Sequence, residues 1–96
     1  MILVYALKSE VYNFIYVGMT NKLEERIERH NKGYVKSTKV FIPFRLFYFE
    51  KCTNRTEARK REKFLKSTSG KKFLKTLLKN SNHLQGWFSS KSGINK

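Results

Sequence analysis

The sequence contains no aspartate, and all seven of its acidic residues are glutamate. An aspartate-based two-metal site and an EF-hand calcium loop are therefore excluded. The single cysteine, Cys52, excludes an intramolecular disulfide and a zinc site built from several cysteines, and it fits a reducing, cytosolic setting. No run approaches the roughly 18 apolar residues that a membrane span needs. The apolar start, residues 1–7, has no basic segment before it, so we expect a strand there and not a signal peptide.

Positive charge is what the chain has in excess. Its 21 lysines and arginines give a net charge of +14 over 96 residues. A chain of this length forms one small domain, whose limited core leaves little room for a large buried cofactor. The aromatic content of 15% favours a folded domain over a disordered basic tail. Because so strong a charge favours a polyanionic partner, we expect nucleic acid before an acidic membrane surface.

The apolar pattern predicts three strands. Residues 1–7 and 14–19 are two strands of a hairpin, joined by a polar loop. Because side chains alternate along a strand, Tyr5 and Tyr16 belong to the faces that also hold Leu7 and Gly18. Residues 44–51 form a third strand, which is apolar on both faces and is therefore expected at the centre of the sheet.

Three helices are also predicted. The first ends near residue 31 and begins at a cap on Thr20 or Asn21, and the second ends near residue 66 and begins at Thr53 or Asn54. The third covers residues 70–79, with Ser69 as its cap and the apolar stripe Phe73, Leu74, Leu77 and Leu78.

These elements predict an α+β fold for residues 1–79: a small three-stranded antiparallel sheet flanked by three helices. Between the first helix and the third strand lies a basic loop. Periodicity is lost in residues 80–96, which we interpret as a polar tail with Trp87 and Phe88 as candidates for docking.

Candidate functional residues are polar groups on faces that should be apolar. Glu62 lies four residues after Ala58 and three before Leu65, which predicts an inward carboxylate. Such a group needs a metal ion or an ion-pair partner, and Arg26 or a neighbouring lysine would serve as a purely structural partner. Both alternatives remain open.

Two further pairs have the same ambiguity. Arg26 and His30 are four residues apart at the edge of the first helix's apolar stripe, so they face one space. Tyr5 and Tyr16 lie on adjacent strands, and pairing can bring both hydroxyls to one face. A histidine or a strand tyrosine alone is more often a packing residue. The five residues together supply a base, a phosphate clamp, a proton-handling group and a metal carboxylate.

With these residues in this order, the sequence resembles the GIY-YIG nuclease family. Leu3-Val4-Tyr5 stands where the family has Gly-Ile-Tyr, and Tyr16-Val17-Gly18 stands where it has Tyr-Ile-Gly. Residues 19–30 match the family's following helix, and residues 56–66 look like the helix with its metal-binding glutamate. The resemblance covers residues 1–78. Within the family, the sequence is similar to small stand-alone members and to the N-terminal nuclease domain of the excision-repair incision subunit.

The sequence departs from the family pattern at three points. Leu3 replaces the first glycine of the signature, and Met19 stands where excision-repair relatives often have lysine. The asparagine that some members carry beyond the metal-binding glutamate has no counterpart here.

The resemblance implies a divalent-metal-dependent endonuclease that hydrolyses phosphodiester bonds in DNA. Tyr16 would be the general base, Tyr5 and His30 would orient the nucleophile, and Arg26 would clamp the phosphate. Glu62 would hold one Mg²⁺ or Mn²⁺ ion, since Mg²⁺ needs few protein carboxylates. Because one such site cuts one strand and the sequence shows no evident surface for self-association, we expect a monomer that nicks DNA, branched or damaged DNA included. We also expect a cytoplasmic, nucleoid-associated protein with no membrane partner, and DNA repair is among its expected settings.

The expected nucleic-acid contacts promise little base recognition, because phosphate contacts position without specifying sequence. They are Lys32, Lys36, Thr38, Lys39, Arg55, Arg59, Lys60, Lys63 and Lys66. Two other readings stay open. The first is a non-catalytic nucleic-acid-binding module, which would not require the complete set of five site residues. The second is a basic ribosome- or membrane-associated protein, which would need no inward carboxylate.

Overall fold

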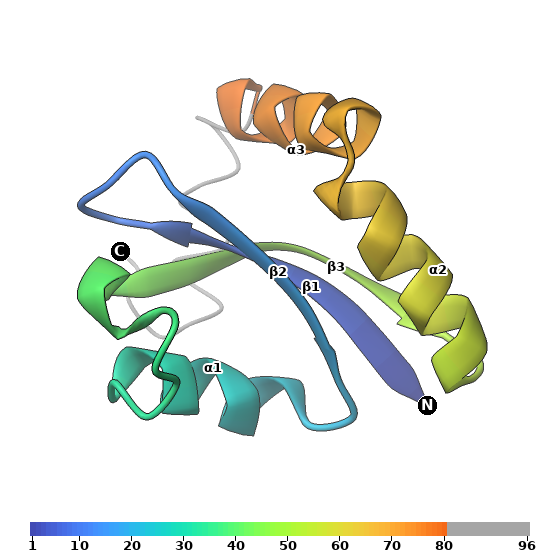
Figure 1. The fold of residues 1–96 in the computed structure, drawn as a ribbon, viewed down its shortest axis with the longest axis horizontal. Helices are drawn as coiled ribbons and strands as arrows, with labels where there is room; N and C mark the ends of the chain where they lie inside the picture. The colour runs from blue at the N-terminus through green and yellow to red at the C-terminus, as the bar shows by residue number, and fades with distance from the viewer. Residues whose placement is uncertain (81–96) are drawn as a thin grey trace.

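The computed structural model describes residues 1–80 and confirms the α+β class. One antiparallel sheet and three helices make up the fold, with a short 3₁₀ turn before the last strand (Figure 1). The elements are β1 (Ile2–Ser9), β2 (Ile15–Thr20), α1 (Leu23–Asn31), η1 (Lys39–Phe41), β3 (Phe44–Cys52), α2 (Arg55–Lys66) and α3 (Thr68–Lys79). Trp87 and Phe88, for which docking is predicted, lie outside the described residues, as does nearly all of the predicted tail.

The order of the strands is β2-β1-β3, so β1 is central. The prediction that the third strand is central is therefore wrong. β3 is apolar on both faces for another reason: Phe44 packs in the cluster under α1, whereas Phe47 packs in the cluster under α2 and α3. Residues three apart on a strand lie on opposite faces, which places these two phenylalanines on different sides. The register changes between Ala6 and Leu7 along the β1–β3 pair, and the extra residue on β3 lets the adjacent Phe47 and Tyr48 pack in the same cluster.

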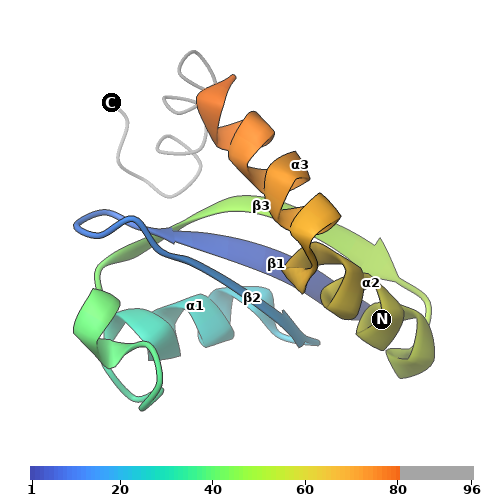
Figure 2. The same cartoon turned by 45° about the horizontal axis from the view of Figure 1, so that its top comes forward.

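The two faces of the sheet carry separate hydrophobic clusters, and helices cover both (Figure 2). On one face, Tyr5 and Leu7 of β1 pack against Leu23 and Ile27 of α1. On the other face, the alternate residues of β1 and β2 pack against α2 and α3 in a cluster that includes Val4, Ala6, Val17, Leu65 and Leu74. This alternation follows the period of two expected for strands, and it places the predicted site residues of the two strands on the α1 side.

The ends of the helices differ in part from the predicted ones. α1 begins after Lys22, which makes no side-chain cap, because Thr20 lies in β2 and its hydroxyl accepts a hydrogen bond from the Lys22 amide at 3.0 Å. α2 is capped by Asn54, as predicted, through a 2.9 Å bond from the Glu57 amide. α3 begins two residues earlier than predicted, because Ser67 caps it and accepts from the Gly70 amide.

The end of α1 positions the loop that follows it. Gly33 has a φ of 80°, its amide donates to the His30 carbonyl, and the Tyr34 amide donates to the Arg29 carbonyl, both at 3.0 Å. This pair of bonds is the Schellman motif, which favours glycine at the left-handed position. The chain then turns back along the sheet, where the Asn31 side chain bonds the Phe44 backbone in both directions. The loop is therefore held against the face that carries Tyr5.

Candidate active site

Tyr5 and Tyr16 meet on the α1 face of the sheet. In the β1–β2 register Tyr5 lies opposite Gly18 and Leu7 lies opposite Tyr16, and the two tyrosine rings are 6.1 Å apart at their centroids. A Cβ atom at Gly18 would lie 2.8 Å from the Tyr5 hydroxyl oxygen and 2.9 Å from the Tyr16 ring. Glycine is therefore required at position 18, because any side chain would push the rings apart.

His30 lies beneath the tyrosines and is fully buried. Its Nε2 atom is 3.0 Å from the Tyr5 hydroxyl, and its Nδ1 atom is 2.9 Å from the hydroxyl of Thr38. The Thr38 hydroxyl donates its hydrogen to the Val35 carbonyl at 3.3 Å. It must then accept from Nδ1–H, since it has one hydrogen to give. The imidazole is thus the Nδ1–H tautomer, and its Nε2 atom accepts a hydrogen bond from the Tyr5 hydroxyl.

Tyr5 and His30, the two titratable members of this hydrogen-bonded chain, both have shifted pKa values, mainly because they are buried. Burial raises the pKa of Tyr5 to about 12, against a smaller opposing effect of hydrogen bonding to Arg26. Burial lowers the pKa of His30 to about 4, and the positive charges of Arg26 and Arg29 add to that effect. At neutral pH both groups are therefore uncharged, so Tyr5 keeps its proton and donates a hydrogen bond to His30.

Thr38 is not the surface residue that its basic neighbours predict. Its side chain is fully buried and its hydroxyl is engaged on both sides, by His30 and by Val35. The prediction that it contacts nucleic acid is corrected to a role in fixing the His30 ring. No sequence signal distinguishes it from Ser37, since the partner that selects it lies eight residues earlier on α1.

Arg26 reaches the same two tyrosines from α1. Hydrogen bonding to Tyr5 raises the pKa of Arg26, and Tyr16 adds to that effect. The Nε atom of Arg26 is buried and has no hydrogen-bond partner among residues 1–80. A buried guanidinium N–H that lacks an acceptor is costly, and an incoming anion would satisfy it.

Glu62 stands on α2, on the opposite side of the sheet from α1. Its side chain is 22% exposed, and one carboxylate oxygen is 2.9 Å from the Lys66 ammonium one helical turn later. Of the two structural partners left open by the sequence, the structure therefore selects the lysine and not Arg26. Glu62 is still close enough to Tyr5 for its charge to contribute to the raised pKa of that hydroxyl.

The residues present fit a metal ion that is held jointly by the protein and the substrate phosphate better than an ion that is held by the protein alone. Within the described part of the chain, no three histidine, cysteine or glutamate side chains come together as a metal site. Mg²⁺ is commonly held by one or two carboxylates together with substrate phosphates. Glu62 can supply one such carboxylate, provided that Lys66 releases it.

The other residues predicted to bind nucleic acid have exposed side chains on two sides of the molecule. One group follows α1, where Lys32 also pairs with Glu28 at 3.2 Å. The second group lies on α2. The members are Lys32, Lys36 and Lys39 in the first group, and Arg55, Arg59, Lys60, Lys63 and Lys66 in the second. Their contacts with nucleic acid stay predictions.

Comparison with known proteins gives a consistent result. The family model described as the GIY-YIG catalytic domain matches residues 1–76. A UPF0213 protein of Pediococcus pentosaceus is 41% identical over 71% of this chain and 73% of its own length, and one of Staphylococcus saprophyticus is 39% identical over 66% and 78%. A UPF0213 protein of Clostridium perfringens is 45% identical over 54% of this chain, and the match spans 57% of that relative's length. No solved structure matches the chain.

Proposed function

The chain belongs to the GIY-YIG family of nuclease domains, and on that premise we propose that it is an endonuclease that hydrolyses phosphodiester bonds in DNA with the help of a divalent metal ion. The observation that carries the proposal is the buried, unpartnered Nε–H of Arg26 beside the hydroxyls of Tyr5 and Tyr16. This N–H group lacks an acceptor, which a phosphate oxygen would supply, and it lies next to the two tyrosine hydroxyls.

Tyr16 is the general base in this proposal, and Tyr5 is not. The Tyr5 hydroxyl is committed to His30 and is held in its protonated form by burial. Tyr16 is only half-buried, so a water molecule can reach its hydroxyl. Arg26 interacts with both Tyr5 and Tyr16, so its guanidinium lies beside the candidate base. Arg26 would thus bind the phosphate next to Tyr16.

Tyr5 and His30 then position the attacking water and do not take its proton. Their hydrogen-bonded chain ends at the Val35 carbonyl, so it holds the Tyr5 ring in one place beside Tyr16. Side chains that are held in place in this way lower the entropic cost of reaching the transition state.

Glu62 would hold the ion, with Lys66 turned toward phosphate. When bound, a divalent ion supplies charge stabilisation for the phosphate and a more acidic water. Glu62 provides its negative charge from a half-buried position, where it attracts a cation more strongly than it would in water.

We further propose that the protein is a monomer that nicks one strand, because the described residues supply one such site. The basic residues on the two sides of the domain are suited to phosphate contacts and not to base readout, so sequence preference should be weak. Light scattering at micromolar concentration tests the monomer, and a stable dimer would contradict it.

The non-catalytic binding module remains the second candidate, and one observation favours it. The Glu62 carboxylate already has a partner in Lys66 at 2.9 Å, so it does not require a metal ion for charge balance. In that case Glu62 is a structural residue and the basic surfaces alone carry the function.

Paired variants separate the two candidates. Cleavage of a supercoiled plasmid is measured with Mg²⁺ or Mn²⁺ for Tyr16→Phe and Glu62→Gln, and the thermal midpoint is measured on the same samples. As controls, Tyr12→Phe and Glu57→Gln change the same chemical groups at exposed positions. The enzyme predicts that cleavage falls by several orders of magnitude in the first two variants only, with DNA binding and folding kept. Undiminished cleavage by Tyr16→Phe, or failure of Glu62→Gln to fold, would remove the catalytic assignment.

A further inference from the structure

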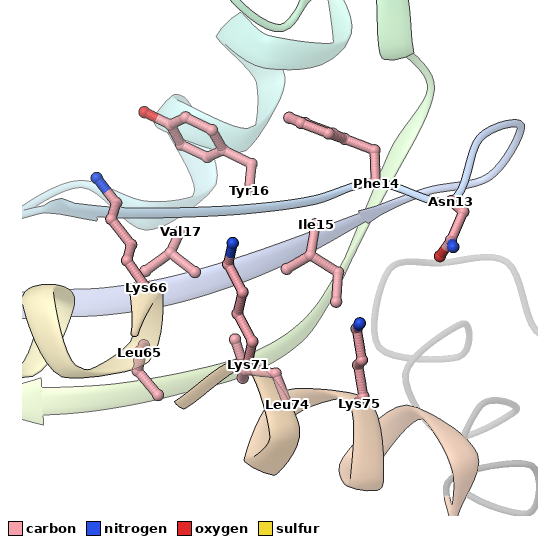
Figure 3. Close-up of a pocket in the computed structure, with 10 residues that line it drawn as sticks. All are labelled: Asn13, Phe14, Ile15, Tyr16, Val17, Leu65, Lys66, Lys71, Leu74 and Lys75. Atoms are coloured by element: carbon pink, nitrogen blue, oxygen red, sulfur yellow. The ribbon is translucent and has the colours of Figure 1, made fainter. Parts of the chain in front are cut away.

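A groove runs between β2 and the helix pair α2–α3, on the face of the sheet opposite α1 (Figure 3). Its volume is about 520 Å³. Lys66 borders it at one end and Asn13 borders it at the hairpin loop. Tyr16 lies on β2 at the edge of the groove, with its ring on the α1 side of the strand (Figure 3). The groove therefore leads away from the candidate base along the exposed edge of the sheet.

One wall of this groove is positively charged. Lys66 of α2 and Lys71 and Lys75 of α3 extend their side chains from the helices toward β2 (Figure 3). Lys71 and Lys75 are four residues apart, a rise of about 6 Å along the helix axis, which is close to the separation of neighbouring phosphates on one polynucleotide strand. No glutamate lines the groove. Lys66 pairs with Glu62 of its own helix at 2.9 Å, so Lys71 and Lys75 are the two groove lysines best placed to meet phosphates.

The floor of the groove is apolar. Ile15 and Val17 of β2 point into it, and Leu65 and Leu74 close it from the helices. An apolar floor beneath a row of cations suits a ligand with a flat, weakly polar side and a chain of negative charges. A polynucleotide strand has both, in its bases and its phosphates.

The size of the groove decides between one strand and two. A volume of 520 Å³ lies within the range of about 300–1,000 Å³ that encloses a drug-sized molecule. It holds roughly one or two nucleotide units and cannot admit a double helix.

We propose that this groove binds an unpaired DNA strand next to the scissile phosphate, with Lys71 and Lys75 on successive phosphates. The inference rests on the proposed nuclease function for its location, because it takes Tyr16 as the reaction centre. It adds a substrate preference, in that DNA with a single-stranded segment at the cleavage point is bound better than continuous duplex.

The test measures binding without cleavage. A fluorescent dT12 oligonucleotide is titrated with the full chain in EDTA, over a series of salt concentrations, and anisotropy gives the Kd. The variant is the double substitution Lys71→Gln with Lys75→Gln. The control is Lys72→Gln with Lys79→Gln, which removes the same charge from the same helix at exposed positions that do not line the groove.

We expect the groove variant to weaken dT12 binding about tenfold at low salt, and to reduce the magnitude of the log–log salt slope by about 1.4, at about 0.7 for each lost phosphate contact on a single strand. The control should change both quantities far less. Equal losses in the two variants would overturn the inference, since the charge would then act from any position on α3.

The same titrations with a 12-base-pair duplex identify the occupant. We expect the groove variant to lose less affinity for the duplex than for dT12, and an equal loss would overturn the assignment to an unpaired strand. Cleavage by the unmodified protein is assayed separately with Mg²⁺. If the groove variant selectively loses dT12 binding but the unmodified protein does not cleave, the groove assignment holds and the nuclease proposal is rejected. If the unmodified protein cleaves but the groove and control variants bind dT12 equally, the nuclease proposal holds and the groove assignment is rejected.

Discussion

Lowering the pH should unfold this protein through His30. The imidazole is fully buried and neutral, with both ring nitrogens hydrogen-bonded, and its pKa falls from 6.5 to about 4. In the unfolded chain the ring regains its ordinary pKa, so between pH 6.5 and pH 4 the unfolded state binds more protons. The contribution of His30 to the free energy of unfolding is therefore present above pH 6.5 and is lost as the pH falls toward 4.

The two pKa values set the size of the effect. At pH 5 protonation favours the unfolded chain by a factor of about 30, which corresponds to about 2 kcal/mol. For a small domain with a urea m value of about 1–2 kcal/mol per molar, the unfolding midpoint should move down by about 1–2 M relative to pH 7. The seven glutamates also titrate in the acid range, so the effect of His30 must be isolated.

The effect of His30 is isolated by urea unfolding of the protein and of His30→Gln, each at pH 7 and pH 5. The glutamine amide can still accept from Tyr5 and donate to Thr38 but does not titrate. The protein should lose about 2 kcal/mol more than the variant between the two pH values. Parallel losses would refute the reasoning. If the variant does not fold, NMR titration of the His30 ring in a His83→Gln background serves instead, and a pKa near 6.5 would be the refuting result.

Three stability predictions follow from close packing and from one ion pair, each measured by urea unfolding. Gly18→Ala should cost about 1–3 kcal/mol, because the added methyl group displaces the Tyr5 and Tyr16 rings; an unchanged midpoint would show that the rings move freely. Gly70→Ala should lower the free energy of unfolding more than Gly18→Ala does. Its methyl group would overlap the backbone of Phe64 and Leu65, which cannot move aside as a side chain does, and a smaller loss than in Gly18→Ala would contradict this. Glu50→Gln should cost less than about 1 kcal/mol, although Arg61 binds both carboxylate oxygens, because the two side chains are 22% and 39% exposed; a loss above about 2 kcal/mol would mean that the pair is effectively buried.

The sequence predicted much of the fold because its signals are local. The alternation along β1 and β2 placed Tyr5 and Tyr16 on one face, and the four-residue spacing of α1 placed Arg26 and His30 on the other side of the same space. Their chemical roles stay predictions. The position of β3 in the sheet could not be predicted from its local pattern. Two apolar faces indicate that both faces of a strand are covered, but they do not show whether both of its edges are paired.

Long-range partners were also beyond local patterns. Thr38 stands between basic residues and was expected at the surface, yet the turn after α1 brings it to His30. Ser67 and Ser69 are equally good caps by composition, and the close approach of Gly70 to the end of α2 decides between them. The partner of Glu62 was one of two candidates, and the helical spacing favours the lysine that lies one turn away.

The separation of the two faces of the sheet has a consequence for protein engineering. The hydrogen-bonded chain from Tyr5 to Val35 lies entirely on the side of α1, whereas Lys71 and Lys75 stand on α3, on the far side of the sheet. A library of substitutions at these two exposed positions would leave the tyrosine–histidine centre unaltered. Directed evolution could thus select new ligands on one face of this small scaffold while the other face keeps its geometry.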